Sequence, residues 1–435
     1  MEANSSKKKG RISRVRHWCS KHFSDVPLLS WLIGAPVAAV LEDFVGTPLA
    51  LGLGLPKVPV LFGFVLMLKK PLLIPSILIY MILIYILPVV VTAKLTAPLF
   101  NRLASKLLNV SGRLSVVIHL LLLYAGLHLW SSISAYRLLT LKLTLIAVMV
   151  TLSLNVINGY MGEFSCSHPG FMALGAYGAS VFTVLLFVND KIFGPAHLPA
   201  YLAPYMFPIA LILGGCLASL GALAIAIPSF RTRGDYLAII SLAFMFIVKS
   251  MIENLEVVGG PRGLSSQPDL AALPIVFIWA VLCIWITNNF VRSTMGKALN
   301  AVRDNELAAD AMTVNTRRTK IIAFLFGAFW AGVAGGLFAH VLRYVNPGTF
   351  GIQKLAEVLA MVYFGGLNSV YGSILGAVSL SLLSEMLRPL EMLKWIIIPL
   401  LLILLMIFRP TGLISFKEFD VIKLIQPRNN SREKS

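Results

Sequence analysis

The sequence contains little charge, since only 13% of its 435 residues are Asp, Glu, Lys or Arg. Soluble globular domains carry about 25% of these residues. Hydrophobic residues make up 57% of the chain, and a water-soluble fold of this size has no interior large enough to hide so much apolar surface. A lipid bilayer solvates such a surface, so the sequence predicts an integral membrane protein.

Cysteine is scarce and does not cluster. The four cysteines form no CxxC motif, which argues against a disulfide framework or a zinc site; they are Cys19, Cys166, Cys216 and Cys283. The sequence also lacks a metal-binding histidine pair and a nucleophile motif. A phosphate-binding loop is missing too, because Gly296-Lys297 has neither the spacing nor the hydroxyl of that motif. We therefore predict no metal, no cofactor and no enzymatic activity.

Acidic residues are half as frequent as basic ones, with 19 against 37 and a formal charge of +18. No aromatic-rich basic surface or nucleic-acid motif accompanies this excess, which argues against nucleic-acid binding. The basic residues gather between apolar runs and at the termini, as they do in cytoplasmic segments of membrane proteins. We expect a cytoplasmic location for the segments 1–25, 94–114, 229–234, 292–320 and 416–435, and the opposite side for 255–271 and 343–352.

Apolar runs of about 20 residues, the length of a spanning helix, recur along the chain. They lie at 47–68, 72–93, 115–135, 138–158, 170–189, 205–228, 235–254, 272–291, 320–342, 353–371, 373–388 and 394–409. The run 353–371 contains Lys354 and Glu357, and 373–388 is short. We therefore predict an all-α, polytopic transmembrane bundle of about ten spans with re-entrant or partial helices. The shorter run 26–41 ends before Glu42-Asp43 and suits an interfacial segment.

Several stretches form a recognisable set in a fixed order. The first runs from Asn158 to Ser165 and continues through His168, Gly170-Phe171 and Gly175–Tyr177; the others are Arg231–Ile239, Gly259–Leu264, Gly296–Lys320 and Phe408–Leu413. Together they resemble the permeases of branched-chain amino acid ABC importers of the LivM type. The resemblance covers roughly residues 140–415. The chain departs from the family pattern at Glu163, where the family usually has Gln, and at Thr313, where it usually has Gly.

The resemblance implies a membrane-spanning transport subunit with no ATPase of its own. Its implied partners are a sister permease subunit, two ATP-binding cassette subunits, an extracytoplasmic solute-binding protein and the lipid bilayer. Its implied substrate is a branched-chain amino acid, and its location is the bacterial plasma (inner) membrane, with both termini cytoplasmic. We divide the chain into a basic tail (1–25), a membrane hairpin region (26–110), a permease domain (111–415) and a C-terminal tail (416–435).

The polar segment 292–320 favours a short helix on the cytoplasmic surface. Asp304 or Asn305 can cap it, and the residues that follow form a small apolar face: Leu307, Ala308, Ala311 and Met312. An ordinary charged loop is the alternative. The resemblance implies a coupling helix that receives the motion of the ATPase, with the residues Asn305, Glu306, Ala308, Ala309, Asp310, Val314 and Asn315.

Glu163 and His168 occupy a stretch broken by Gly and Pro between two apolar runs. Ionisable residues at membrane depth usually face a cavity, and transporters place solute pathways at broken helices. We therefore expect these two residues to line the translocation pathway together with Gly170, Phe171 and Tyr177. The alternative is a solvated interfacial location, in which Pro169 only begins the next helix.

Other charged residues leave two interpretations open. Arg231, Arg233 and Asp235 form either an interfacial cluster or a cytoplasmic-side gate. Glu357, Glu385 and Arg388 are most simply charges of loops or helix ends.

Three other functions remain possible from the sequence. They are a permease for another small solute such as urea or a different amino acid, a secondary transporter with an ion site at Glu163 or Glu385, and a membrane scaffold without transport activity.

Overall fold

A computed structural model describes residues 25–59, 63–189, 193–230, 236–388, 393–409, 412–416 and 419–426. Within these ranges, nine helices are long and apolar enough to cross a membrane. They are Leu28–Gly52, Pro71–Val110, Gly112–Ser132, Ala135–Met161, His168–Phe187, Ala200–Ser229, Tyr236–Asn254, Leu273–Arg292 and Thr316–Leu342. Two shorter apolar helices follow, Val370–Met386 and Ile396–Phe408. The prediction of an all-α polytopic bundle with partial helices is confirmed.

The described residues pack into two compact units. Unit 1 comprises those up to Arg137 and those from Asp420 onward, and unit 2 extends from Leu138 to Phe419. The predicted domain limits at 25, 110 and 415 stay a prediction.

Unit 1 is helical in its described part. Its elements are α2 (Leu28–Gly52), α3 (Phe64–Lys69), η2 (Pro71–Leu73), α4 (Ile74–Met81), the π-helical turn η3 (Ile82–Ile86), α5 (Leu87–Val110), α6 (Gly112–Ser132) and α18 (Val421–Ile425). The predicted span 47–68 is wrong, because α2 ends at Gly52 and the chain turns at Gly54, whose φ is 70°. The segment 26–41, considered interfacial above, largely belongs to α2.

A buried ion pair accommodates Glu42 within α2. Nη1 and Nη2 of Arg137 donate hydrogen bonds to the two oxygens of the Glu42 carboxylate, the first over 2.8 Å. Both side chains are at most 2% exposed. A bidentate pair compensates much of the cost of removing the two charges from water. The pair therefore lets Glu42 occupy a buried position inside α2.

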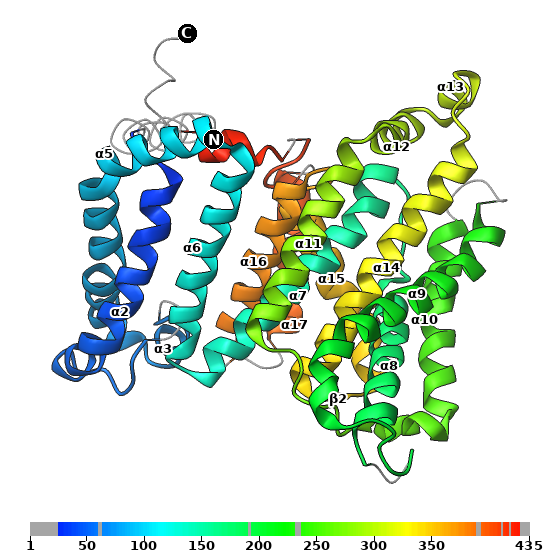
Figure 1. Ribbon diagram of the computed structural model, residues 1–435, viewed down its shortest axis with the longest axis horizontal. Helices are drawn as coiled ribbons and strands as arrows, with labels where there is room; N and C mark the ends of the chain where they lie inside the picture. Colours follow the sequence, from blue (N-terminus) through cyan, green and yellow to red (C-terminus); the bar gives the residue numbers. More distant parts are fainter. Residues whose placement is uncertain are drawn as a thin grey trace. The chain divides into compact units, whose positions relative to one another are not determined.

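Unit 2 contains the remaining elements. They are α7 (Ala135–Asn155, from Leu138 on), the π-helical turn η4 (Val156–Met161), α8 (His168–Phe187), η5 (Ala200–Leu202), α9 (Ala203–Ser229), α10 (Tyr236–Asn254), η6 (Glu256–Val258), η7 (Gly260–Arg262), β1 (Leu264–Ser265), α11 (Leu273–Arg292), α12 (Thr294–Asp304), α13 (Glu306–Ala311), α14 (Thr316–Leu342), β2 (Tyr344–Val345), η8 (Pro347–Phe350), α15 (Ile352–Gly365), α16 (Val370–Met386) and α17 (Lys394–Phe408). The two short strands pair antiparallel. Helices α12 and α13 lie at one end of this unit and β2 lies at the opposite end (Figure 1).

Helices α8, α9 and α14 pack with their backbones in direct contact. A Cβ atom on Gly175 of α8 would lie 2.1 Å from the carbonyl oxygen of Gly332 on α14. On α9, a Cβ atom on Gly214 would lie 2.7 Å from the carbonyl oxygen of Gly175. Close approach at small residues is a common way for helices to associate in lipid, where no hydrophobic effect drives them together. These glycines therefore determine how closely α8, α9 and α14 pack at the centre of unit 2.

We expect Gly175→Ala to destabilise the protein, because the added methyl group must displace the backbone of α14. Overpacking of this kind costs about 1–3 kcal/mol, which corresponds to a fall of several degrees in melting temperature. Thermal unfolding of the purified protein in detergent measures the effect. Gly52→Ala is the control, because nothing lies within 4 Å of the Cβ position there. Equal melting temperatures for the two variants would contradict this packing.

Candidate functional site

The stretch between α7 and α8 is a break in the helical structure, as the sequence suggested. The end of α7 widens into the π-helical turn η4, which stops at Gly162 with a left-handed φ of 78°. Residues 163–167 are non-helical, and α8 begins at His168 with Pro169 in its first turn. π-helical turns within helices are frequent at functional sites.

Hydrogen bonds from neighbouring elements fix the backbone of this break. The Ser165 amide donates to Oδ1 of Asn158 over 3.2 Å, and the Cys166 amide donates to Oγ of Ser241 on α10 over 2.9 Å. Because the broken chain has specific partners on both sides, it forms an ordered part of the bundle.

The residues predicted to follow Glu163 in the pathway lie in the packed interior. His168 and Phe171 are fully buried, and the Phe171 ring lies 5.5 Å from the rings of both Phe244 and Phe324. Tyr177 is also buried and donates a hydrogen bond from its hydroxyl to the carbonyl of Val345 on β2. Gly170 contacts the backbone of α10, since a Cβ atom there would lie 3.3 Å from the Cα atom of Met245. Their role in a pathway stays a prediction.

Lys320 connects the break to α13. Its Nζ atom donates to Oε1 of Glu163 over 2.7 Å and to Oε2 of Glu306 over 2.9 Å. The side chain of Lys320 is 10% exposed, against 25% for Glu163 and 51% for Glu306. One cation at the start of α14 thus holds a carboxylate of the break and a carboxylate of α13 together.

Arg303 of α12 makes a second connection to the same break. Its guanidinium donates to the carbonyl of Gly159 over 3.4 Å, and its stem packs on Gly162, where a Cβ atom would lie 2.4 Å from Cγ. Its guanidinium carbon also lies 5.4 Å from the centre of the Phe416 ring. Helices α12 and α13 are therefore both attached to the break between α7 and α8.

Helix α13 presents apolar side chains to the outside. Leu307 is 73% exposed and Met312, just after the helix, is 78% exposed. Ala308 and Asp310 are exposed too, whereas Ala309 faces inward at 5%. A polar loop with this apolar face suits docking to another protein.

The cap that the sequence suggested at Asn305 and a second one at Asn315 fix the ends of this segment. Oδ1 of Asn305 accepts from the Ala308 amide at the start of α13, and Oδ1 of Asn315 accepts from the Arg318 amide at the start of α14. Between them, the Val314 amide donates to the carbonyl of Ala309. Thr313 has a φ of 66°, a conformation that glycine adopts without strain, which explains why the family pattern has Gly at this position.

The predicted cytoplasmic-side cluster of Arg231, Arg233 and Asp235 lies outside the described residues.

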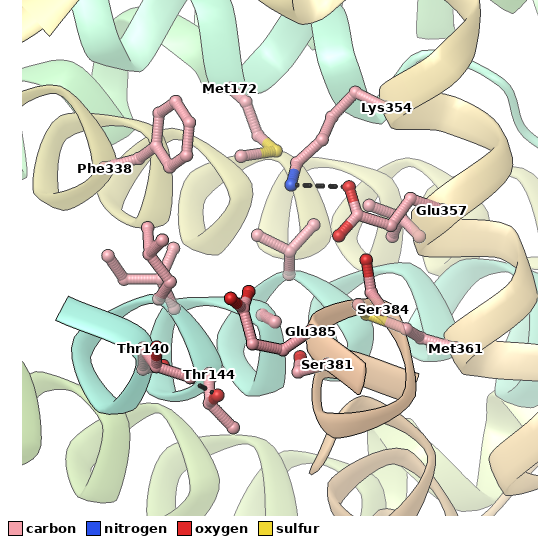
Figure 2. Close-up of a pocket in the computed structure, with 15 residues that line it drawn as sticks. Thr140, Thr144, Met172, Phe338, Lys354, Glu357, Met361, Ser381, Ser384 and Glu385 are labelled. Atoms are coloured by element: carbon pink, nitrogen blue, oxygen red, sulfur yellow. Dashed lines mark hydrogen bonds and ion pairs between the residues drawn. The ribbon is translucent and has the colours of Figure 1, made fainter. Parts of the chain in front are cut away.

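A cavity of about 200 Å³ lies among α7, α8, α14, α15 and α16. Lys354 and Glu357 of α15 and Glu385 of α16 point toward a common space (Figure 2). Thr140, Thr144, Ser381 and Ser384 add hydroxyl groups, and the rest of the lining includes Leu143, Val150, Met172, Phe338, Val358 and Met361. A wall that combines apolar side chains with convergent polar groups is typical of a small-molecule site. Among the described residues, no cluster of three or more His, Cys, Asp or Glu side chains is arranged to bind a metal.

Sequence reasoning missed three residues of these candidate sites. It counted Lys320 among the basic residues of a loop and took Lys354 and Glu357 as signs of a weak span, while it considered Glu385 as an ion site only for a secondary transporter. The usable signal was the position of ionisable residues within apolar runs, which in membrane proteins indicates a functional site. Lys320 pairs with Glu163, which lies 157 residues away, so no local pattern could identify that contact.

The fold of the described residues is that of a multi-pass helical membrane protein. Residues 136–408 match the family model described as branched-chain amino acid transport system / permease component. Because the match covers more than half of the 435 residues, the chain belongs to this family.

Curated relatives agree with the family match. The chain is 31% identical over 307 residues to the high-affinity branched-chain amino acid transport system permease protein LivM of Escherichia coli (strain K12), covering 62% of this chain and 68% of that protein. It is 30% identical over 179 residues to LivH of Salmonella typhimurium, covering 40% and 56%. It is 25% identical over 236 residues to a probable LivM of Methanocaldococcus jannaschii, covering 48% and 68%. No solved structure matches the chain significantly.

We expect Lys320→Met to lower the melting temperature of the purified protein by several degrees, because it leaves two neighbouring carboxylates without their cation. Loss of a partly buried charged partner costs about 1–3 kcal/mol. Adding Glu163→Gln to Lys320→Met should recover part of this loss, because it removes one of the two charges; such non-additivity measures the interaction. Arg318→Met is the control, since it removes the same charge at an exposed position nearby. Additive effects would show that Lys320 and Glu163 do not interact.

Proposed function

We propose that this protein is the permease subunit of an ATP-driven importer of branched-chain amino acids. It pairs with a sister permease, two ATP-binding cassette subunits and an extracytoplasmic solute-binding protein in a bacterial inner membrane. Family membership supports the proposal, and so do the names of the relatives LivM and LivH, which describe two permease proteins of one transport system. ATP hydrolysis occurs in the separate cassette chains.

The observation that carries the coupling part of the proposal is the exposed apolar face of α13. Leu307 and Met312 project from a polar segment in which such side chains would otherwise be buried. In the complex this face binds a groove on a cassette subunit, which buries apolar surface from both partners.

Motion of α13 reaches the membrane helices through Lys320. Its ion pair with Glu306 transmits displacement of α13 to α14, and its ion pair with Glu163 transmits it to the break before α8. Because α8 and α14 are in backbone contact, the two helices respond as one body. Alternating access then follows from ATP-driven closure of the cassette subunits.

The end of unit 2 that carries α12 and α13 faces the cytoplasm in this proposal. Basic residues collect at this end, namely Arg292, Lys297, Arg303, Arg317 and Arg318, and the positive-inside rule places them on the cytoplasmic side. The N- and C-terminal tails, which are also basic, lie on the same side.

Cysteine labelling with an impermeant reagent tests this orientation in a chain freed of its own cysteines. Ala308→Cys and Arg262→Cys replace exposed residues at opposite ends of unit 2. In intact cells we expect labelling of the cysteine at 262 and none of the cysteine at 308. The reverse pattern would overturn the orientation.

Reconstitution tests the transport function. The full complex in proteoliposomes should take up leucine, isoleucine and valine only with ATP, and an ionophore that collapses proton and sodium gradients should have no effect. Urea and unrelated amino acids serve as competing solutes. Uptake that continues without ATP and disappears with the ionophore would identify a secondary transporter instead.

The same assay tests the role of α13. Leu307→Asp places a charge in the docking face, and we expect uptake and transport-coupled ATP hydrolysis to fall by about tenfold or more, the effect of disrupting a buried interface contact. Ala301→Asp is the control, because it adds the same charge at an exposed position of the neighbouring α12. If both variants transport equally well, α13 is not the coupling helix.

A further inference from the structure

The cavity beside α15 contains two charged side chains, Lys354 and Glu357, whose contribution to helix stability does not explain their presence. Nζ of Lys354 donates to Oε2 of Glu357 over 3.0 Å, and the same Nζ lies 5.5 Å from the centre of the Phe338 ring. The two charged side chains are only 18% and 31% exposed. An ion pair three residues apart on one helix stabilises it only slightly, whereas charges within an apolar bundle are costly. A ligand that uses these charges accounts for their presence.

A second carboxylate approaches the same space from the opposite wall. Glu385 of α16 is 22% exposed and pairs over 2.9 Å with Arg388, whose side chain is 64% exposed and thus reaches solvent. Figure 2 shows Glu385 directed toward the space that Lys354 and Glu357 also face. The cavity therefore offers one cation and two carboxylates at close quarters.

Apart from four hydroxyl-bearing residues, Thr140, Thr144, Ser381 and Ser384, the remaining wall of the cavity is apolar. Val150 of α7, Met172 of α8, and Val358 and Met361 of α15 contribute to it. The cavity has a volume of about 200 Å³. Sites for drug-sized ligands have volumes of about 300–1,000 Å³, so this cavity suits a smaller solute. A small solute with one positive group, one negative group and an aliphatic side chain matches these three features.

The ion pair also borders a second, more open hollow. Lys354 and Glu357 line a space of about 530 Å³ together with Tyr344, Asn346 and Gln353. This hollow lies beside β2 and η8, at the end of unit 2 opposite α13 (Figure 1). The pair thus lines both the open hollow and the narrower cavity.

We propose that the cavity binds the zwitterion of the transported amino acid, and that the Lys354–Glu357 pair is the gate through which the solute enters it. Lys354 donates to the carboxylate of the solute, while Glu357 and Glu385 accept from its ammonium group. The aliphatic side chain packs against Val358 and Met361. When the solute binds, Lys354 exchanges the Glu357 carboxylate for the carboxylate of the solute, and Glu357 exchanges Lys354 for the ammonium group of the solute. The pair therefore separates without leaving a buried charge unpaired. This inference rests on the function proposed above.

Photolabelling of the complete complex in nanodiscs tests the site directly. The probe is a radiolabelled leucine analogue with a diazirine in its side chain, and mass spectrometry identifies the labelled peptides. We expect label on the helices that line the cavity, which are α7, α8, α14, α15 and α16. Excess leucine should suppress it, whereas 4-methylpentanoate and 3-methylbutylamine, which each lack one charged group, should not.

Substitutions of single residues test which charged side chains bind the probe. Lys354→Met and Glu385→Gln should each reduce the label by about tenfold or more, the effect of losing a charge-assisted hydrogen bond. Lys249→Met is the matched control, because Lys249 pairs with Glu253 over 3.7 Å on α10, outside the cavity. Unchanged elution of each variant in gel filtration confirms that it is folded. Label that is equal in all variants, or that lies outside these helices, overturns the inference.

The uptake assay on the same wild-type preparation separates the two proposals. ATP-dependent leucine uptake without label at the cavity leaves the transport function standing and rejects this site. Absence of ATP-dependent amino acid uptake rejects the proposed function, and the inference is rejected with it. Suppression of the label by sodium or protons rather than by leucine identifies an ion site and likewise rejects the inference.

Discussion

Direct backbone contact among α8, α9 and α14 is the constraint on which unit 2 depends. In lipid, packing alone must hold the helices together, and contact at Gly175, Gly214 and Gly332 maximises it. Two of these helices begin at candidate functional features of the unit. Helix α8 starts just after the break that contains Glu163, and Lys320 lies near the start of α14. In the proposed mechanism, displacement at either helix start is carried along the pair α8 and α14.

Electrostatics links the rigid helices to the surface. Lys320 stands between Glu163 and Glu306 with both distances below 3 Å, so its charge is compensated from two elements at once. Arg303 attaches α12 to the carbonyl of Gly159 in the same break. Interactions of this kind are sensitive to small changes in distance, yet they do not block movement as apolar interdigitation does. They suit a joint between a docking helix and a membrane bundle.

The two ends of unit 2 differ in chemistry. At the end of α12 and α13, apolar side chains project outward from a basic surface. At the opposite end, the charges of Lys354, Glu357 and Glu385 point inward to a cavity. The first arrangement favours contact with a protein and the second favours contact with a small polar solute. A transport subunit needs both kinds of contact. The membrane-spanning helices of unit 2 separate its two ends.

The sequence by itself determined the class of the fold. Its apolar runs required helices that satisfy their own backbone hydrogen bonds in lipid, and the helix after Asn305 followed from local capping chemistry that the structure reproduces. The polar segment 292–320 and the break before His168 were also visible, because Gly, Pro and Asn act on their immediate neighbours. The family resemblance rested on motifs of the same local kind.

Only the tertiary structure decided where the charges find their partners. The Glu42 carboxylate looked like the end of a span until Arg137, 95 residues later, proved to neutralise it. Glu163 was expected to face a pathway, and its partner Lys320 lies 157 residues away. Lys354 and Glu357 are neighbours in sequence, but Glu385 and the apolar wall that complete their cavity come from other helices. The free energy of a charge in a membrane protein depends on its surroundings in space, which the order of residues along the chain does not contain.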